Sequence, residues 1–234
     1  MDIGVDIMKT GLNNNQLKII ALIAMTCDHL GKQVFPDIVI LQIVGRLAFP
    51  IFAYMIAEGC CYTRNMKKYF GMTAAVALVC QIIYFVAMGS LYMCVMVTFS
   101  LSIVLIALIK EARKRKSVLL WLVFGLAVAV TFFLCTIVPN LPTGTDFYID
   151  YGIIGVMLPV VIYVYEERLT KLVATSLMLV LLGTYLGGVQ WWGLLSVPFL
   201  AVYNGCRGKM HLKYIFYVYY PVHLGVIYLI SLVL

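Results

Sequence analysis

The residues best suited to chemistry lie in one stretch, residues 17–64, which consists of two long apolar runs. Asp28 and His29 are adjacent near the end of the first run. Arg46 lies inside the second run, and Glu58 lies towards its far end. In a bilayer, an Arg or Asp at a helix centre costs about 2.5–3.5 kcal/mol on insertion scales, so such residues usually serve a function. The pattern therefore predicts that this stretch holds the functional centre.

A histidine beside a carboxylate is typical of general-base chemistry. The carboxylate of Asp28 would hold the ring of His29 in one tautomer while the other ring nitrogen abstracts a proton. The alternative interpretation is a structural role, in which both side chains find hydrogen-bond partners inside a helix bundle and take no part in a reaction. Arg46 either forms an ion pair with Asp28 that fixes the hairpin, or orients Asp28 or stabilises a thioester oxyanion. These roles do not exclude each other.

Two further residues keep two interpretations each. His223 follows Pro221 in YYPVH, so it is either a structural histidine at a helix kink or a second functional histidine. Glu58 either pairs with the nearby Arg64 or Lys67, or belongs to a ligand site.

The composition predicts an integral membrane protein. The chain is 64% hydrophobic and only 12% charged, whereas a soluble domain is about half apolar and about a quarter charged. Its apolar runs have helix length, which excludes an outer-membrane barrel. We therefore expect an all-α, polytopic transmembrane helix bundle forming a single domain over residues 1–234. The formal charge of +7 is then expected to report topology and contact with anionic lipids rather than nucleic acid.

The apolar runs predict about nine spans, with boundaries set by turn-forming and charged residues. The expected spans are 17–35, 39–62, 69–88, 91–109, 117–138, 151–165, 172–186, 189–203 and 214–234. The sixth looks short unless it begins near Phe147.

The distribution of charge predicts the orientation. If the N-terminus is cytoplasmic, the basic loops at 64–68, 110–116, 166–171 and 207–213 all lie inside, as the positive-inside rule requires. The outer loops then carry mainly acidic residues, and the C-terminus lies outside. We expect a multi-pass protein of a bacterial inner membrane, inserted by its first helix without a cleavable signal.

This topology predicts two polar layers. With a rise of about 1.5 Å per residue, His29, Arg46 and His223 fall in the outer-to-middle third of the bundle. The inner rim carries a basic, glycine-containing set that suits a phosphate-bearing ligand. Its candidate ligand-binding residues are Glu58, Arg64, Asn204, Arg207 and Lys213. The two layers would be the ends of one tunnel.

The seven cysteines show no CxxC pair and no metal-ligand spacing. Those in apolar runs are expected to behave as small hydrophobes, so neither a disulfide framework nor a metal site is predicted. Gly183, Gly187 and Gly188 allow close helix packing, which is compatible with a homodimer without identifying one.

Several motifs together resemble the TraX family over nearly the whole chain. They are LKIIALIAMTCDHLG, GRLAFPIFAYMIAEG followed by TRN and KKY, YNGCRG, and YIFYVYYPVHL. That family is named for a conjugation-plasmid protein held to acetylate the pilin N-terminus, and it is similar to membrane acyltransferases with an essential histidine at the end of their first helix. The resemblance implies that His29 is catalytic, that Arg46 matches a motif arginine, and that acetyl-CoA is bound from the cytoplasm. Cys206 stands where the pattern leads us to expect a lysine, which removes one phosphate contact.

These features favour a membrane-embedded acetyltransferase that uses acetyl-CoA as co-substrate. The acceptor would be the hydroxyl or amine of a glycan, a lipid-linked sugar or a protein N-terminus. The rival hypothesis is a proton-coupled transporter with a relay of His29, Asp28 and His223, although neither an internal repeat nor an even number of spans supports it. A scaffold without chemistry would leave the buried polar set unexplained.

Overall fold

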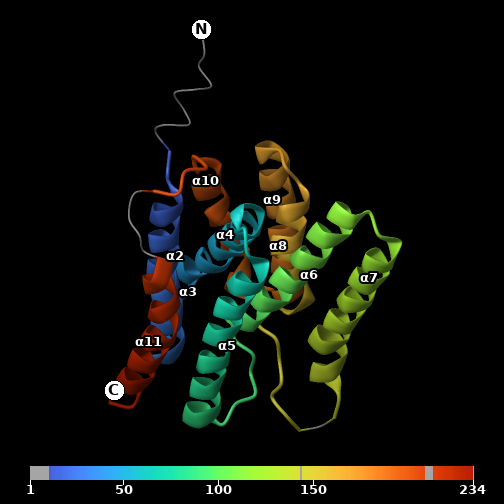
Figure 1. Ribbon diagram of the computed structural model, residues 1–234. Coiled ribbons are helices and arrows are strands. Elements are labelled where there is room, and N and C mark those ends of the chain that lie inside the picture. Colours follow the sequence, from blue (N-terminus) through green and yellow to red (C-terminus); the bar gives the residue numbers. More distant parts are fainter. Residues whose placement is uncertain (1–10, 143, 209–212, 234) are drawn as a thin grey trace. The chain divides into compact units, whose positions relative to one another are not determined.

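The computed structural model describes residues 11–142, 144–208 and 213–233. Within these ranges the chain is helical, with two isolated β-bridges and no strand, which confirms the expected all-α class. Figure 1 shows the helices in chain order. Their bounds are α2 Asn14–Gln33, α3 Val39–Gly45, α4 Ala48–Tyr62, α5 Met66–Met88, α6 Val95–Arg115, α7 Val118–Phe132, η1 Phe133–Ile137, η2 Val138–Asn140, α8 Gly152–Val164, α9 Arg168–Leu186, η3 Gly188–Leu195, α10 Ser196–Ala201 and α11 Lys213–Ser231.

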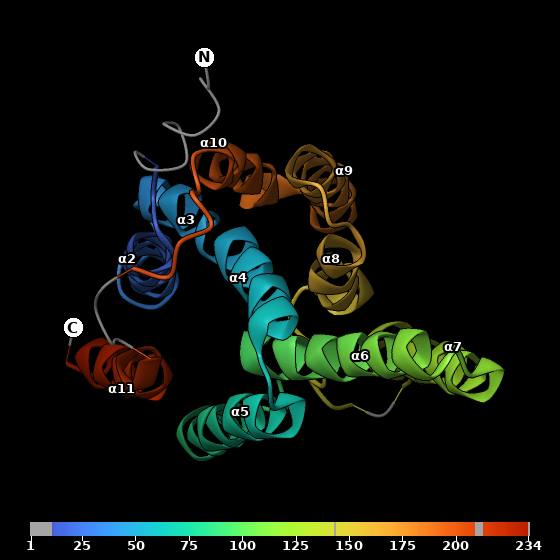
Figure 2. The same ribbon diagram turned by 45° about the horizontal axis from the view of Figure 1, so that its top comes forward.

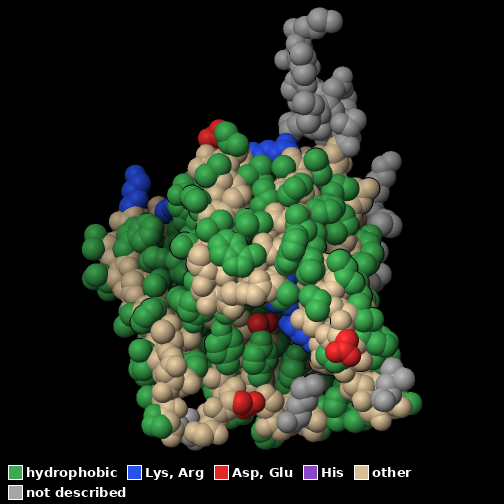
Figure 3. Space-filling view, turned by 180° about the vertical axis from the view of Figure 1, so that it is seen from behind, with side chains coloured by type: hydrophobic (Ala, Val, Ile, Leu, Met, Phe, Trp, Pro, Cys, Tyr) green, Lys and Arg blue, Asp and Glu red, His purple; other side chains and the backbone are tan. Residues whose placement is uncertain are grey.

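Five helical segments of the described chain are long and apolar enough to cross a membrane. They are Val39–Tyr62, Met66–Ala87, Val95–Arg115, Val118–Asn140 and Arg168–Leu186. Two shorter apolar helices, Gly152–Val164 and Tyr217–Ser231, accompany them. Hydrophobic side chains cover much of the face seen in Figure 3, with few charged side chains among them. The expected apolar helical architecture is present, although fewer segments meet this criterion than the nine spans predicted.

The chain divides into two compact units. One, which we call the terminal unit, combines Met1–Met55 with Glu167–Leu234, and the other, the middle unit, is Ile56–Glu166. In the terminal unit α2 packs against both α3 and α11, and η3 packs against α3 and α9. Figures 1 and 2 both show α2 and α11 side by side. Helix α2 therefore has neighbours on two of its faces.

The second predicted span is interrupted. A turn at Arg46 and Leu47 separates α3 from α4, where one continuous helix over 39–62 was expected. The cause is Pro50, which has no N–H to donate to the carbonyl of Arg46 one turn earlier. The turn places Arg46 at the junction of two helices.

The eighth predicted span is not an α-helix throughout. A 3₁₀-helix, η3, covers Gly188–Leu195 and leads into the short α10. It begins at Gly188 directly after Gly187, and the positive φ angles of these two glycines, 54° and 69°, end α9. Pro198 removes a further helical hydrogen bond. A Cβ on Gly183 would lie 2.8 Å from the indole of Trp191, so this glycine allows η3 to lie close against α9.

The middle unit contains α5 to α8 and the end of α4. Helix α6 packs against α5, α7 and α8, around a core of Cys60, Ile103, Leu105, Ile106, Ile109, Cys135, Ile149, Val156 and Val160. The sixth predicted span begins at Gly152 rather than near Phe147, because Tyr151 adopts a left-handed conformation with φ 62°. This helix is therefore short.

Candidate active site

Helix α2 positions two adjacent functional residues on different faces. Its first turn is fixed by a capping box, in which Asn13 accepts from the N–H of Gln16 and the Gln16 side chain accepts from the N–H of Asn13. Consecutive helical residues point about 100° apart. Asp28 accordingly contacts α3, whereas His29 contacts α11. The site therefore consists of two groups, one on each face.

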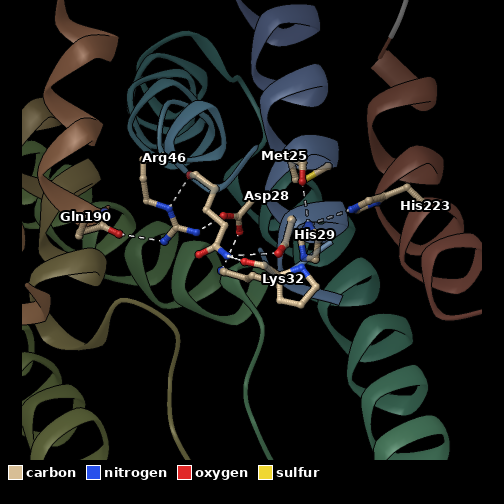
Figure 4. A network of polar contacts seen from close by, with 10 residues as sticks. Met25, Asp28, His29, Lys32, Arg46, Gln190 and His223 are labelled. Carbon is tan, nitrogen blue, oxygen red and sulfur yellow. Dashed lines mark hydrogen bonds and ion pairs between the residues drawn. The ribbon is translucent and has the colours of Figure 1, made fainter. Parts of the chain in front are cut away.

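The carboxylate cluster comprises Asp28, Lys32, Arg46 and Gln190. Asp28 accepts from the Nη2 of Arg46, and its other oxygen lies 2.7 Å from the Nζ of Lys32 one turn along α2. Arg46 also donates through Nη1 to Gln190 Oε1 at 3.0 Å, and its Nε lies 3.4 Å from the carbonyl of Gln42. Figure 4 shows this chain of contacts from Lys32 to Gln190. The ion pair predicted between Asp28 and Arg46 is present.

Two glycines let α3 approach α2 at this point. A Cβ on Gly45 would lie 2.7 Å from the Cα of Asp28, and one on Gly31 would lie 2.8 Å from the Cβ of Leu41. Real Cβ atoms do not approach other atoms this closely, so both positions need glycine. The short separation brings the guanidinium of Arg46 onto Asp28.

Gln190 is a functional candidate that the sequence interpretation missed. Its side chain is buried, with 4% exposed, and its Nε2 has no hydrogen-bond partner among the described residues. Buried amide groups are almost always paired, so an orphaned donor calls for an explanation. Gln190 comes from the predicted eighth span, and only its position as the sole amide between GGV and WWG could have drawn attention to it.

The histidine cluster comprises Thr26, His29, Tyr219 and His223. The Nδ1 of His29 lies 2.9 Å from the carbonyl of Met25, and the Nδ1 of His223 lies 3.0 Å from the carbonyl of Tyr219. A carbonyl only accepts, so each Nδ1 carries a hydrogen. The Nε2 of each neutral ring then has the lone pair, and His223 Nε2 lies 3.5 Å from His29 Nδ1.

Tyr219 links the two helices beside these rings. Thr26 donates its only hydroxyl hydrogen to the carbonyl of Leu22 at 2.9 Å, so Tyr219, whose hydroxyl lies 2.6 Å from Thr26 Oγ1, is the donor of that bond. The ring of Tyr219 stacks on His223 with centroids 5.3 Å apart. Tyr219 and His223 are four residues apart on α11, a spacing from which sequence reasoning could have found Tyr219.

The tautomer of His29 is held differently from the expectation. The sequence suggested that Asp28 orients the ring, but the hydrogen-bond partner of its Nδ1 is the Met25 carbonyl within the same helix. Asp28 is engaged by Arg46 and Lys32 instead. Lys32, which the sequence interpretation left out of the site, is therefore a member of it.

The residues predicted to form the inner rim fall in both units. In the terminal unit, Asn204 uses its side chain to donate to the carbonyl of Gly11 and to accept from the N–H of Cys206, both at 2.9 Å. It thereby joins the loop at 202–208 to the start of α2, and Arg207 is exposed in the same loop. The backbone of Lys213 begins α11, while its side chain lies outside the described residues.

The remaining rim candidates belong to the middle unit. Glu58 is buried in α4, with 5% exposed, whereas Arg64 is exposed in the loop before α5. Lys110 donates to the carbonyls of Cys60 and Thr63 at 3.1 and 3.4 Å, which satisfies the end of α4. Among the described residues no group of three or more His, Cys, Asp or Glu side chains could hold a metal.

These features describe an all-helical protein with several helices long and apolar enough to cross a membrane and with a buried polar site on α2. The chain belongs to the TraX family, since the family model described as TraX protein matches residues 13–231. It is 27% identical over 248 residues to the probable fimbrial assembly protein FimC, serogroup H1, of Dichelobacter nodosus, covering 91% of this chain and 93% of that protein. A shorter match, 47% identical over 38 residues, is to the uncharacterized protein RP591 of Rickettsia prowazekii (strain Madrid E), and it covers 16% of this chain and 15% of that protein. No solved structure matches significantly. The family resemblance expected from the motifs is thus confirmed.

Proposed function

We propose that this protein is a membrane-embedded acetyltransferase that moves an acetyl group from acetyl-CoA to a hydroxyl or amine at the membrane or its outer face. The observation that carries the proposal is the tautomer in which the ring of His29 is held. Its Nδ1–H is held by the Met25 carbonyl, so the lone pair of the neutral ring is on Nε2. A ring fixed in one tautomer, half-buried and beside a second histidine is suited to act as a general base.

In the proposed reaction His29 Nε2 takes the proton of the acceptor O–H or N–H. The acceptor atom attacks the thioester carbonyl carbon, a C–O or C–N bond forms, and the C–S bond breaks. The imidazolium returns the proton to the leaving thiolate, which gives free CoA. During the step the lone pair of His223 Nε2, 3.5 Å from His29 Nδ1, helps to stabilise the charged ring.

Acetyl-CoA would be recognised from the cytoplasmic rim. Arg207 and Arg64 are exposed loop arginines suited to its phosphates, whereas Asn204 supports its loop by the two hydrogen bonds described above. Glu58 and Lys213 are retained as further candidates. By analogy with its family and with the fimbrial assembly protein, the acceptor would include a protein N-terminus, with glycans and lipid-linked sugars as alternatives.

The experiment that tests this proposal is CoA release from acetyl-CoA by the purified protein in detergent, with a peptide N-terminus, a glycan or a lipid-linked sugar as acceptor. His29→Gln should lower the rate by about 10²–10⁴-fold, the usual contribution of a general base. Cys27→Ala, on the same helix, is the matched control and should retain the wild-type rate. Thermal unfolding with CoA measures binding separately, because a ligand at 100 times its Kd stabilises by about 2.7 kcal/mol.

The outcomes separate the two functions. Loss of release in His29→Gln with intact stabilisation by CoA supports chemistry at His29 and donor binding elsewhere. A wild-type protein that neither binds CoA nor releases it would refute the acetyltransferase. Proton flux in proteoliposomes that depends on His29 and His223 would then establish the proton-coupled transporter.

A further inference from the structure

In the side-chain amide of Gln190, the oxygen and nitrogen positions are fixed by a hydrogen bond, and the nitrogen has no hydrogen-bond partner among the described residues. Its Oε1 accepts from Arg46 Nη1 at 3.0 Å, so the other end of the amide must be the NH₂ group. That Nε2 is buried and has no acceptor among the described residues. An unpaired buried donor destabilises the folded protein, and a bound oxygen atom that accepts from it would remove this penalty.

The charges around Gln190 favour a negative partner. The cluster has two cations, Lys32 and Arg46, and a single carboxylate, Asp28. The side chain of Arg46 is only 9% exposed, while that of Lys32 is 48% exposed. A single buried carboxylate shared by two cations leaves the cluster with an excess positive charge next to the orphaned donor.

Gly193 lies beside this donor. A Cβ built on Gly193 would lie 3.8 Å from Gln190 Nε2, 3.6 Å from the carbonyl oxygen of Arg46 and 3.7 Å from Pro50. These are ordinary van der Waals separations, so a methyl group on Gly193 would contact Nε2 without displacing it. Gly193 differs in this respect from Gly45 and Gly31, which have no space for a Cβ.

We propose that Gln190, together with Arg46 and Lys32, binds an anionic oxygen group of the acceptor, a carboxylate or a phosphate. This assignment rests on the proposed function only in giving the group to the acceptor. Gln190 Nε2 donates to the anion, and the excess positive charge of the cluster stabilises it. Arg46 thus positions Gln190, and Gln190 supplies the free donor.

The test is thermal unfolding of the purified protein in detergent with sodium acetate or sodium phosphate, against sodium chloride at the same ionic strength and pH. Wild type should show a rise in Tm of about 2–4 °C with the favoured anion, as expected when binding adds about 1 kcal/mol to a protein of this size. Gln190→Leu removes the donor and should abolish the rise. Gln190→Glu keeps an acceptor for Arg46 and repels an anion, so it should fold and also lose the rise.

Gln81→Leu is the matched control. Both polar atoms of the Gln81 side chain are likewise buried without a partner, but this residue lies in α5 of the middle unit. It undergoes the same chemical change and should keep the response to the anion.

A response to acetate alone identifies a carboxylate, and a response to phosphate alone identifies a phosphate group. No response of wild type to either anion, relative to chloride, would overturn the proposal, because water would then be the partner of Nε2. An equal response in wild type, Gln190→Leu and Gln190→Glu would also overturn it, since the anion would bind elsewhere. None of these results depends on CoA release, so the acetyltransferase is judged separately.

Discussion

At the scale of single residues, each ionisable group in the site has partners that limit what it can do. The Nη2 and Nη1 groups of Arg46 are bonded to Asp28 and Gln190, which makes this residue an organiser of the cluster. His29 is bonded through one ring nitrogen, which leaves the other for chemistry. The sequence predicted that Asp28, His29, Arg46 and His223 would gather, because such side chains are rarely buried without a role. It also indicated the ion pair of Asp28 with Arg46, but it wrongly gave His29 the carboxylate of Asp28 as the partner of its Nδ1.

The ion pair of Asp28 and Arg46 supports a prediction about stability. Asp28→Asn leaves the buried guanidinium without its anion and should destabilise the protein by about 3–5 kcal/mol. The double variant Asp28→Leu with Arg46→Met removes both charges and should recover much of that loss, because well-packed apolar groups can replace a buried ion pair. Unfolding of the three proteins in detergent measures both effects. A double variant no more stable than Asp28→Asn would show that the pair is not the source of the stability.

At the scale of elements, glycine and proline decide how α2, α3 and η3 fit together. Pro50 ends α3 before α4 begins, and Gly45 allows α3 to contact α2 at Asp28. The run 39–62 was predicted as one span because its apolar pattern is continuous, although Pro50 near its middle removes a helical hydrogen bond. The 3₁₀ geometry of η3 was not predictable either, since hydrophobic periodicity does not distinguish it from a short α-helix over eight residues.

Gly45 and Gly193 lead to opposite expectations about substitution by alanine. Gly45→Ala places a methyl group 2.7 Å from the Cα of Asp28, and such overpacking should cost about 1–3 kcal/mol. Gly193→Ala introduces the same methyl group where contacts remain at 3.6 Å or more, so it should leave stability nearly unchanged. Thermal unfolding of the two variants makes the comparison. Equal stability of both would mean that α2 and α3 are not held as close as described.

Gly193→Ser adds a hydroxyl group at the same position. Its hydroxyl oxygen, one bond beyond a Cβ that lies 3.8 Å from Gln190 Nε2, can reach the orphaned donor. A new buried hydrogen bond should stabilise the protein by about 0.5–1.5 kcal/mol and weaken the response to acetate or phosphate. A serine variant with unchanged stability and an undiminished anion response would contradict this expectation.

At the scale of the whole molecule, the composition predicted the all-α class of the fold. The distribution of charged residues predicted the orientation of the chain in the membrane, which can be tested. The all-helical architecture follows from the long apolar runs and is confirmed, and five helical segments of the described chain are long and apolar enough to cross a membrane, against nine spans predicted. Polar residues in the first span and the 3₁₀ turns of the eighth keep both below the length and hydropathy of a simple span. The division into two units was not visible in the sequence, since it falls inside α4.

The native cysteines test the orientation. Cys61 and Cys206 are exposed, and the positive-inside rule puts both on the cytoplasmic side. A membrane-impermeant maleimide should therefore leave both unlabelled in intact spheroplasts and label both after lysis. Cys94 is buried and serves as the unreactive control. Labelling of Cys206 from outside would reverse the predicted orientation of the terminal unit.

Because Asp28 and His29 are adjacent, the rotational register of α2 determines which neighbouring helix each side chain contacts. Asp28 contacts Arg46 and His29 contacts His223. Both contacts therefore depend on the exact number of residues that precede them in α2. Inserting one residue within the two turns before Asp28 would rotate both side chains by about 100°, which would carry Asp28 towards α11 and take His29 away from it. In this stretch we therefore expect the family to vary by substitution and never by a gain or loss of residues. Gly31 on α2 and Gly45 on α3, which allow the two helices to lie at contact distance, fix the same register.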